Sequence, residues 1–320
     1  MKKFSRSLLL QTFDRKLAEI IQVDLPVLKE IRKFVITSGG KRIRPLFHYF
    51  LVNMNNYKGK LWIDSGAIAE LIHAASLLHD DVIDNAEIRR GKYTIGKLYG
   101  NKVAILSGDY LLTSAIDHLS KMGNIPILNL FNHTIRELTK SELIQMEWEK
   151  NPKISMNTYK KIIYGKTASL FGAVAESAGI LCNLEKNDLK KIRDFGVGIG
   201  MLFQMKDDYI DYFLPASTSG KIENKDFLNG LLTYPAIVLR DYLDNHEKKI
   251  YLAMFAKPER NEEDIKIIHD FYKKYRVREK ILQKMKKEAY SLVAYLNSYA
   301  ESDIRQIMIN QIEKLSGETV

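Results

Sequence analysis

The chain has 320 residues and a formal net charge of +10 at pH 7. Its 46% hydrophobic and 28% charged residues are typical of a globular protein with a sizeable core. One cysteine excludes a disulfide framework, and no uninterrupted apolar run reaches the length of about 18 residues that predicts a membrane span.

The charge surplus comes from 49 lysines and arginines against 39 acidic residues. It suits an anionic partner such as nucleic acid, an acidic membrane surface or a phosphorylated substrate. The densest basic run, residues 273–280, follows a charged helical pattern and is interpreted as a solvated face, so we expect no nucleic-acid partner. The apolar run at residues 7–10 is too short for a signal peptide, and the lone Cys182 suits a reducing compartment, so we expect a cytoplasmic protein.

Most of the chain shows helical periodicity, with apolar residues recurring about every 3.6 positions. Alternating Val/Ile/Thr runs, which would predict strands, are nearly absent. The sequence therefore predicts one all-α domain over residues 1–320, and the helices that start at Ile63 and Asn187 are expected to be central. The predicted helical segments are 17–34, 63–83, 101–122, 127–149, 158–181, 187–213 and the region from 233 onward.

Two clusters of the form D-D-x-x-D lie inside apolar helical segments, where an unpaired carboxylate is costly. The first and last aspartates of each cluster are four residues apart and share one helix face. Such paired carboxylates repel each other unless a cation lies between them. Magnesium is the best fit, since it prefers carboxylates together with water and substrate phosphates. The aspartates are Asp80, Asp81 and Asp84 in the first cluster, and Asp207, Asp208 and Asp211 in the second.

Basic side chains suited to a metal-bound diphosphate lie near both clusters. Residues 39–45 read G-G-K-R-I-R-P, where two glycines permit a tight turn and the proline suits a first helical turn. The adjacent Arg89 and Arg90 follow the first cluster and are predicted to serve separate phosphate groups. Further basic or polar candidates on helices and loops are His73, Lys166, Thr167, Gln204 and Lys221.

Taken in order, these motifs resemble those of the head-to-tail trans-polyprenyl diphosphate synthases, in particular medium- and long-chain members such as octaprenyl or heptaprenyl diphosphate synthase. The resemblance runs from about residue 39 to residue 235. Besides the segments above, it includes E-L-I-H at 70–73, L-L-H-D-D-V-I-D at 77–84, R-R-G-K at 89–92, G-D-Y-L-L at 108–112, E-L-I-Q at 142–145, G-K-T-A-S-L-F at 165–171, F-Q-M-K-D-D-Y-I-D at 203–211 and G-K at 220–221.

The resemblance implies the isoprenoid synthase fold, a single large helical domain around a deep central cavity, usually in a homodimer. It implies about three magnesium ions in each active site. The implied metal ligands are Asp80, Asp84 and Asp207, supported by Asp81, Asp208 and Asp211. The residues implied to hold isopentenyl diphosphate are Lys41, Arg44, His73 and Arg90, and those for the allylic diphosphate are Arg89, Lys166, Thr167, Gln204 and Lys221.

The implied reaction ionises the allylic diphosphate, condenses the cation with isopentenyl diphosphate and eliminates a proton. Product length is expected to depend on Ala75 and Ser76, about one helical turn before Asp80. In the family, bulky aromatics at these places stop the chain early; here both residues are small, and Phe131 is the candidate floor. With both side chains small, the resemblance implies an all-trans product of about twenty carbons or more, and we favour about thirty to forty.

Three positions depart from the family pattern. Ser141 replaces a usual glycine, and Tyr93 replaces the usual proline after R-R-G-K. Leu231 replaces a lysine that often contacts the allylic diphosphate, which puts substrate affinity in question more than the reaction.

Other functions also fit parts of the pattern. A geranylgeranyl diphosphate synthase and a catalytic or regulatory subunit of a heteromeric prenyl synthase share most of these motifs. A terpene cyclase has the acidic motifs but no use for an isopentenyl site. A metal phosphohydrolase would use the His79-Asp80 pair, but it needs further histidines and leaves the second cluster unexplained. Peripheral membrane contact for product release is also expected.

Overall fold

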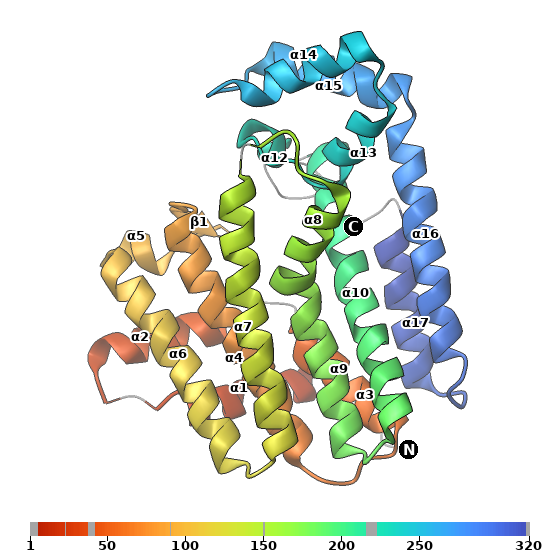
Figure 1. Ribbon diagram of the computed structural model, residues 1–320. Coiled ribbons are helices and arrows are strands. Elements are labelled where there is room, and N and C mark those ends of the chain that lie inside the picture. The colour runs from red at the N-terminus through yellow and green to blue at the C-terminus, as the bar shows by residue number, and fades with distance from the viewer. Residues whose placement is uncertain are drawn as a thin grey trace. The chain divides into compact units, whose positions relative to one another are not determined.

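A computed structural model of the protein describes residues 6–22, 24–37, 42–89, 91–149, 151–215 and 223–317. Within these ranges all regular secondary structure is helical apart from one two-stranded hairpin, which confirms the predicted all-α class (Figure 1). The strands β1 (Ile88–Arg89) and β2 (Lys92–Tyr93) pair antiparallel, with Ile88 opposite Tyr93. The helices are α1 (Arg6–Ile20), α2 (Pro26–Thr37), α3 (Ile43–Met54), α4 (Leu61–Ile83), α5 (Ile95–Tyr99), α6 (Asn101–Lys121), α7 (Ile125–Trp148), α8 (Met156–Ile163), the π-helix η1 (Tyr164–Ala168), α9 (Ser169–Leu181), α10 (Lys186–Phe213), α12 (Lys225–Leu228), α13 (Tyr234–Tyr242), α14 (Asn245–Ala256), α15 (Glu262–Lys274), α16 (Val277–Leu296) and α17 (Asp303–Ser316).

The contacts divide the chain into two compact units. Unit 1 comprises residues 1–135 and 173–193, and unit 2 comprises residues 136–172 and 194–320. Helices α7, α9 and α10 contribute residues to both. The single domain expected over the whole chain stays a prediction.

Helix α4 forms the core of unit 1, where α1, α3 and α6 pack against it. Its side chains Ala67, Ile68 and Leu71 are fully buried, as expected for a helix that is apolar on most faces. Gly66 allows α1 to approach closely, because a Cβ at this position would lie 2.7 Å from the Phe13 ring. The first acidic motif therefore ends a rigid, well-packed helix.

In unit 2, α16 and α17 lie side by side (blue in Figure 1), and α13 and α15 also pack on α16. Helix α10 approaches α16 closely at Gly198, where a Cβ would lie 2.7 Å from Leu292. Capping boxes begin two of the shorter helices, with Asp244 and Glu247 at α14 and Asn261 and Asp264 at α15. These reciprocal bonds satisfy backbone donors that a helix start leaves unpaired.

Most predicted helices are confirmed within a few residues, but the segment 17–34 is not one helix. Helix α1 ends at Ile20 and α2 begins at Pro26. Proline is favoured in the first helical turn and disfavours a helical conformation in the residue before it, so the apolar periodicity continues across a real break. The predicted segment 158–181 is helical but contains the π-helical turn η1.

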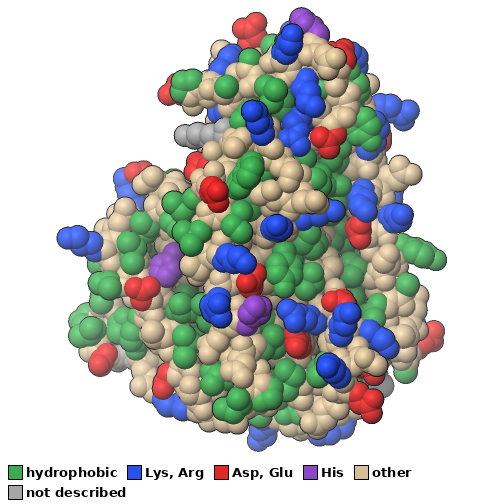
Figure 2. Space-filling model, in the orientation of Figure 1, with side chains coloured by type: hydrophobic (Ala, Val, Ile, Leu, Met, Phe, Trp, Pro, Cys, Tyr) green, Lys and Arg blue, Asp and Glu red, His purple; other side chains and the backbone are tan. Residues whose placement is uncertain are grey.

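Among the described residues, α4 is long and apolar enough to cross a membrane by length and composition, and 56% of its apolar window is buried inside the structure. Its packing in unit 1 accounts for that composition. Basic and acidic side chains are interspersed on the face drawn in Figure 2. The surplus of positive charge therefore does not make that face uniformly basic.

Candidate functional site

The first acidic motif occupies the last turn of α4, and its aspartates have different environments. Asp81 is only 4% exposed, and the Arg89 Nε atom donates to its carboxylate at 2.6 Å. Asp80 is half-buried, and Asp84, which caps the helix, is exposed. The structure thus engages Asp81 in an ion pair, whereas the two residues predicted as metal ligands are more accessible.

The histidine before this motif joins α4 to α6. Its Nε2 atom lies 3.2 Å from the carbonyl oxygen of Ile105 and 3.2 Å from a carboxylate oxygen of Asp109. A Cβ at Gly108 would lie 2.3 Å from the His79 Nε2 atom, so glycine is needed for this close packing. His79 therefore has a structural contact that accounts for its position beside the acidic motif.

A small pocket of about 50 Å³ lies in unit 1 beside the carboxyl-terminal end of α2. It brings together His73 and Arg89, which were predicted to serve different substrates, and it also includes Asp81. Arg44, in the first turn of α3, is half-buried. Lys41 and Arg90, the other predicted isopentenyl residues, lie outside the described residues. The pocket is lined by Phe34, Val35, Arg42, Glu70, His73, Ala74, Leu77, Leu78, Asp81 and Arg89.

The second acidic motif, on α10, shows a similar division. Asp207 is half-buried, whereas Asp208 is only 2% exposed. The Asp208 carboxylate accepts hydrogen bonds from the Tyr159 hydroxyl at 2.5 Å, the Gln204 Nε2 atom at 2.9 Å and the Tyr234 backbone N–H at 3.1 Å. Asp208 is thus held by three neutral donors.

Burial raises the pKa of Asp208 to about 7, with a further contribution from the negative charge of Asp226. The three hydrogen bonds act in the opposite direction, because they favour the ionised form. Burial also raises the pKa of the Tyr159 hydroxyl well above its usual value, and the neighbouring Asp208 adds to that shift. The Tyr159 hydroxyl is therefore the proton donor in this pair.

Asp211, the last aspartate of the motif, holds the segment that follows it. Its two carboxylate oxygens accept the backbone N–H groups of Lys225 at 3.2 Å and Asp226 at 3.1 Å, at the start of α12. The Asn224 backbone N–H also donates to the Asp211 carbonyl at 2.9 Å. These contacts tie the start of α12 to the end of the motif, and the supporting role expected for Asp211 stays a prediction.

The π-helical turn η1 brings two predicted allylic residues next to α7 and α10. The Lys166 ammonium lies 2.9 Å from a carboxylate oxygen of Glu142. The Thr167 hydroxyl donates to the Gln204 Oε1 atom at 2.8 Å, and Gln204 in turn donates to Asp208. Single π-turns inside helices are frequent at functional sites. Lys221, the remaining allylic candidate, lies outside the described residues.

Among the three departures from the family pattern, the structure explains Ser141. Ser141 is buried, its hydroxyl donates to the Leu138 carbonyl at 2.7 Å, and it lies against Gly165. A Cβ at Gly165 would lie 2.4 Å from the Ser141 Cβ atom, so the glycine leaves the space that the serine occupies. Tyr93 is exposed on β2, and Leu231 is half-buried directly after Gly230.

The three residues predicted to set product length are on helices of unit 1. Ala75 is buried on α4, and the Ser76 hydroxyl donates to the His73 carbonyl at 2.9 Å. Phe131, on α7, is fully buried. Their effect on product length stays a prediction.

Carboxylates at the motif ends fit magnesium chemically. Within the part of the chain that the structure describes, no group of three or more His, Cys, Asp or Glu side chains converges as a preformed metal site. Magnesium is commonly bound through one or two carboxylates together with water and substrate phosphates. Asp80 and Asp84, four residues apart at the end of α4, are a donor pair of this kind in unit 1. Asp207 is a half-buried carboxylate of unit 2.

The sequence interpretation missed four residues that the structure places around these motifs. Arg42 was grouped with the phosphate-binding cations, but it is buried and makes ion pairs with Asp14 and Glu70. Lys92 contacts the end of α2, and Tyr159 contacts Asp208. Glu142 was noted only as part of a motif. No local pattern marks these partners, because each contact joins segments far apart in the sequence.

Comparison with known proteins gives consistent matches. The sequence model of the family described as "Polyprenyl synthetase" matches residues 25–272. Octaprenyl diphosphate synthase from Escherichia coli is 32% identical over 219 residues, which are 68% of each chain. Octaprenyl diphosphate synthase from Haemophilus influenzae is 27% identical over 94% of this chain and 91% of the relative. The crystal structure of a decaprenyl diphosphate synthase from Rhodobacter capsulatus superposes with a TM-score of 0.90 and 25% identity, covering 97% of this chain and 96% of the other.

Proposed function

This chain belongs to the polyprenyl synthetase family and is a prenyltransferase with the all-α isoprenoid synthase fold, and from that premise we propose that it is a magnesium-dependent trans-polyprenyl diphosphate synthase. It joins isopentenyl diphosphate to an allylic prenyl diphosphate. The observation that carries the proposal is shared by both acidic motifs. In each motif the second aspartate is buried and hydrogen-bonded by neighbouring donors, whereas the first aspartate is more accessible.

The first chemical step breaks the allylic C–O bond and leaves an allylic cation and pyrophosphate. Lys166, Arg89 and Lys221 hold the diphosphate and offset its charge as it departs. Thr167 and Gln204 orient it, and their hydrogen bond to each other supports that role. When bound at the motif aspartates, magnesium supplies further charge neutralisation of the leaving group.

The second step forms a carbon–carbon bond. Lys41, Arg44, His73 and Arg90 hold isopentenyl diphosphate so that its double bond lies against the allylic cation. The electron pair of that double bond forms the new bond, and the resulting cation loses a proton to the departing pyrophosphate. No side chain needs to act as the base.

We propose a long-chain product, in line with the names of the relatives, which describe octaprenyl and decaprenyl diphosphate synthases. The small side chains Ala75 and Ser76 support this, since neither would close a channel along α4. Phe131 is the proposed floor. A Ser76→Phe substitution is expected to shorten the product, whereas Ser76→Ala should leave its length unchanged, as sizing of the products will show.

A homodimer in the cytoplasm is also proposed, with peripheral membrane contact for release of the apolar product. Exposed apolar side chains on α5 and α6 support an interface on unit 1, since contiguous patches of this kind often mark contacts between proteins. Leu106 is 67% exposed, and Leu98, Tyr99 and Ile105 are exposed nearby in the sequence. The mass of the protein in solution tests this assembly.

The direct test of the function is to incubate the purified chain with magnesium, labelled isopentenyl diphosphate and each short allylic primer, and then to size the products. Long prenyl diphosphates are expected. A product of about twenty carbons, four isoprene units, would favour a geranylgeranyl diphosphate synthase. Conversion of an allylic diphosphate without consumption of isopentenyl diphosphate would favour a terpene cyclase. No turnover at all would favour a subunit that needs a partner chain.

A further inference from the structure

The last backbone carbonyls of α2 accept hydrogen bonds from two cationic side chains, which belong to different sequence motifs. The last carbonyl groups of a helix have no partner within the helix, and they carry its negative dipole end. Here the Arg42 Nη2 atom donates to the carbonyls of Val35 at 3.0 Å and Ile36 at 3.2 Å, and the Lys92 Nζ atom donates to the carbonyl of Thr37 at 3.0 Å. Three successive carbonyls are thus satisfied by the G-G-K-R-I-R-P and R-R-G-K segments.

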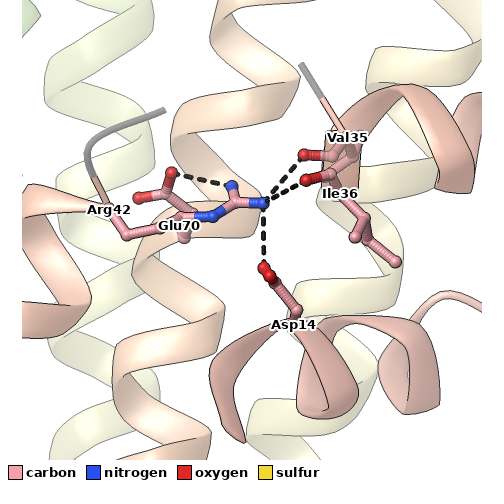
Figure 3. Close-up of polar contacts among 5 residues, drawn as sticks. All are labelled: Asp14, Val35, Ile36, Arg42 and Glu70. Atoms are coloured by element: carbon pink, nitrogen blue, oxygen red, sulfur yellow. Dashed lines mark hydrogen bonds and ion pairs between the residues drawn. The ribbon is translucent and has the colours of Figure 1, made fainter. Parts of the chain in front are cut away.

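Arg42 also ties this helix end to α1 and α4. Its Nη1 atom lies 3.0 Å from the Glu70 carboxylate and its Nη2 atom 3.1 Å from that of Asp14. Figure 3 draws both contacts. The residue is only 7% exposed and has a left-handed backbone, with φ of 48°. A buried guanidinium needs this number of acceptors, because a charge without partners in the interior is strongly destabilising.

Both cations belong to segments that carry residues proposed for isopentenyl diphosphate. Arg89 of the R-R-G-K segment, proposed for the allylic diphosphate, has its own anchor in the ion pair with Asp81. Arg42 stands between Lys41 and Arg44, and Lys92 follows Arg90 by two residues. The Arg42 contacts connect the start of α3 to the last turn of α2. The same end of α2 also lines the small pocket that contains His73.

We propose that the end of α2 is a positioning element, and that Arg42 and Lys92 use it to hold the two phosphate-binding segments in register for isopentenyl diphosphate. This inference rests on the proposed function, because it assigns the segments to that substrate. Neither residue contacts the substrate. They act through the segments that carry Lys41, Arg44 and Arg90, of which the structure describes Arg44.

Lys92 offers the sharper test, because its side chain is exposed and its loss should not impair folding. The matched control is Lys97, an exposed lysine of α5 that pairs with Glu87 at 2.7 Å and makes no contact with α2 among the described residues. Lys92→Met should raise the KM for isopentenyl diphosphate about threefold and leave the KM for the allylic primer unchanged, the pattern expected when binding of one substrate is impaired. Lys92→Arg should restore the wild-type value, and Lys97→Met should change neither constant.

Arg42→Met should have a larger effect of the same kind, about tenfold on the KM for isopentenyl diphosphate. Arg42→Lys should recover only part of it, because an ammonium group cannot span the acceptors that the planar guanidinium reaches. Equal losses for both substrates in the Lys92 variant, or no loss for either, would overturn the proposal. So would an equal effect of Lys97→Met.

Hydrogen exchange separates this inference from the proposed function. In the apo protein, Lys92→Met should speed exchange at the amides of residues 35–37 and 88–93, and Lys97→Met should not. Unchanged exchange in Lys92→Met contradicts the anchoring role whatever the enzyme does. If the wild-type chain converts no primer and binds no isopentenyl diphosphate, the proposed function fails, and the assignment of the segments to that substrate fails with it.

Discussion

The two acidic motifs have the same sequence pattern but bury their central aspartates differently. On α4, Asp81 pairs with the cationic Arg89 at 2.6 Å. On α10, Asp208 accepts hydrogen bonds from three neutral donors, among them Tyr159 and Gln204, and burial raises its pKa to about 7. The comparison shows that one motif is stabilised by a charge pair and the other by hydrogen bonds, although nothing in the D-D-x-x-D pattern distinguishes them.

The largest expected effect concerns what the motifs have in common. Asp80→Asn and Asp207→Asn should each lower kcat by about 10²–10³-fold, because each removes a charge that stabilises the departing diphosphate through the metal. Steady-state kinetics at saturating magnesium measure the loss. Asp117→Asn is the control, since this exposed aspartate of α6 pairs only with Lys121 among the contacts found for it. An effect confined to one motif would contradict their shared role.

The next effect separates the motifs. Arg89→Met should lower the free energy of unfolding by about 3 kcal/mol, since it leaves the Asp81 charge buried without its cation. Urea denaturation measures the change. Adding Asp81→Asn should recover part of the loss, because the buried charge is then absent. A double variant that is less stable than Arg89→Met would show that the ion pair is not the source of the stability.

The free energy of unfolding is expected to depend on pH through His48, a fully buried residue of α3 in unit 1. A comparison of the two motifs at different pH values has to allow for this dependence. Burial lowers its pKa to about 3, against a smaller opposing contribution from the backbone of Trp62. The unfolded chain therefore binds a proton from about pH 6.5 downward, whereas the folded protein does not until about pH 3, so stability falls as the pH drops through this window. Between pH 8 and pH 5 the loss is about 2 kcal/mol. His48→Leu should remove that part of the dependence, as urea denaturation at both pH values will show.

The smallest effect is expected at the neutral donors of the second motif. Tyr159→Phe removes one hydrogen bond to Asp208 and should cost about 1 kcal/mol of unfolding free energy, less than the loss of Arg89 at the first motif. Thermal or urea denaturation measures it. A loss equal to that of Arg89→Met would mean that the two buried aspartates depend equally on their partners.

Helical periodicity predicted the fold class and most helix positions. It failed at 17–34, where Pro26 starts a new helix although the apolar pattern continues. Periodicity indicates which face of a segment is buried. Two consecutive helices can keep the same apolar spacing across the break between them, so the spacing alone does not locate the break.

The candidate site was predictable where residues act in local patterns. The pairs Asp80 with Asp84 and Lys166 with Thr167 could be recognised from their spacing and family resemblance. The partners of Asp81 and Asp208 could not be distinguished in this way, because burial and long-range contacts decide them. Arg42 shows the same limit, since its sequence neighbours are predicted phosphate-binding cations while its own side chain is directed to Glu70 and Asp14.

The central claim is that the aspartates of both acidic motifs take part in the proposed binding of a diphosphate, and pyrophosphate affinity in the aspartate variants tests it most directly. Calorimetric titration with magnesium present compares the wild-type chain, Asp80→Asn, Asp207→Asn and the double variant. If both motifs contribute, each single variant should bind pyrophosphate more weakly than the wild-type chain, and the double variant should bind no better than either one. Wild-type affinity in Asp80→Asn or in Asp207→Asn would show that this motif takes no part and would contradict the account.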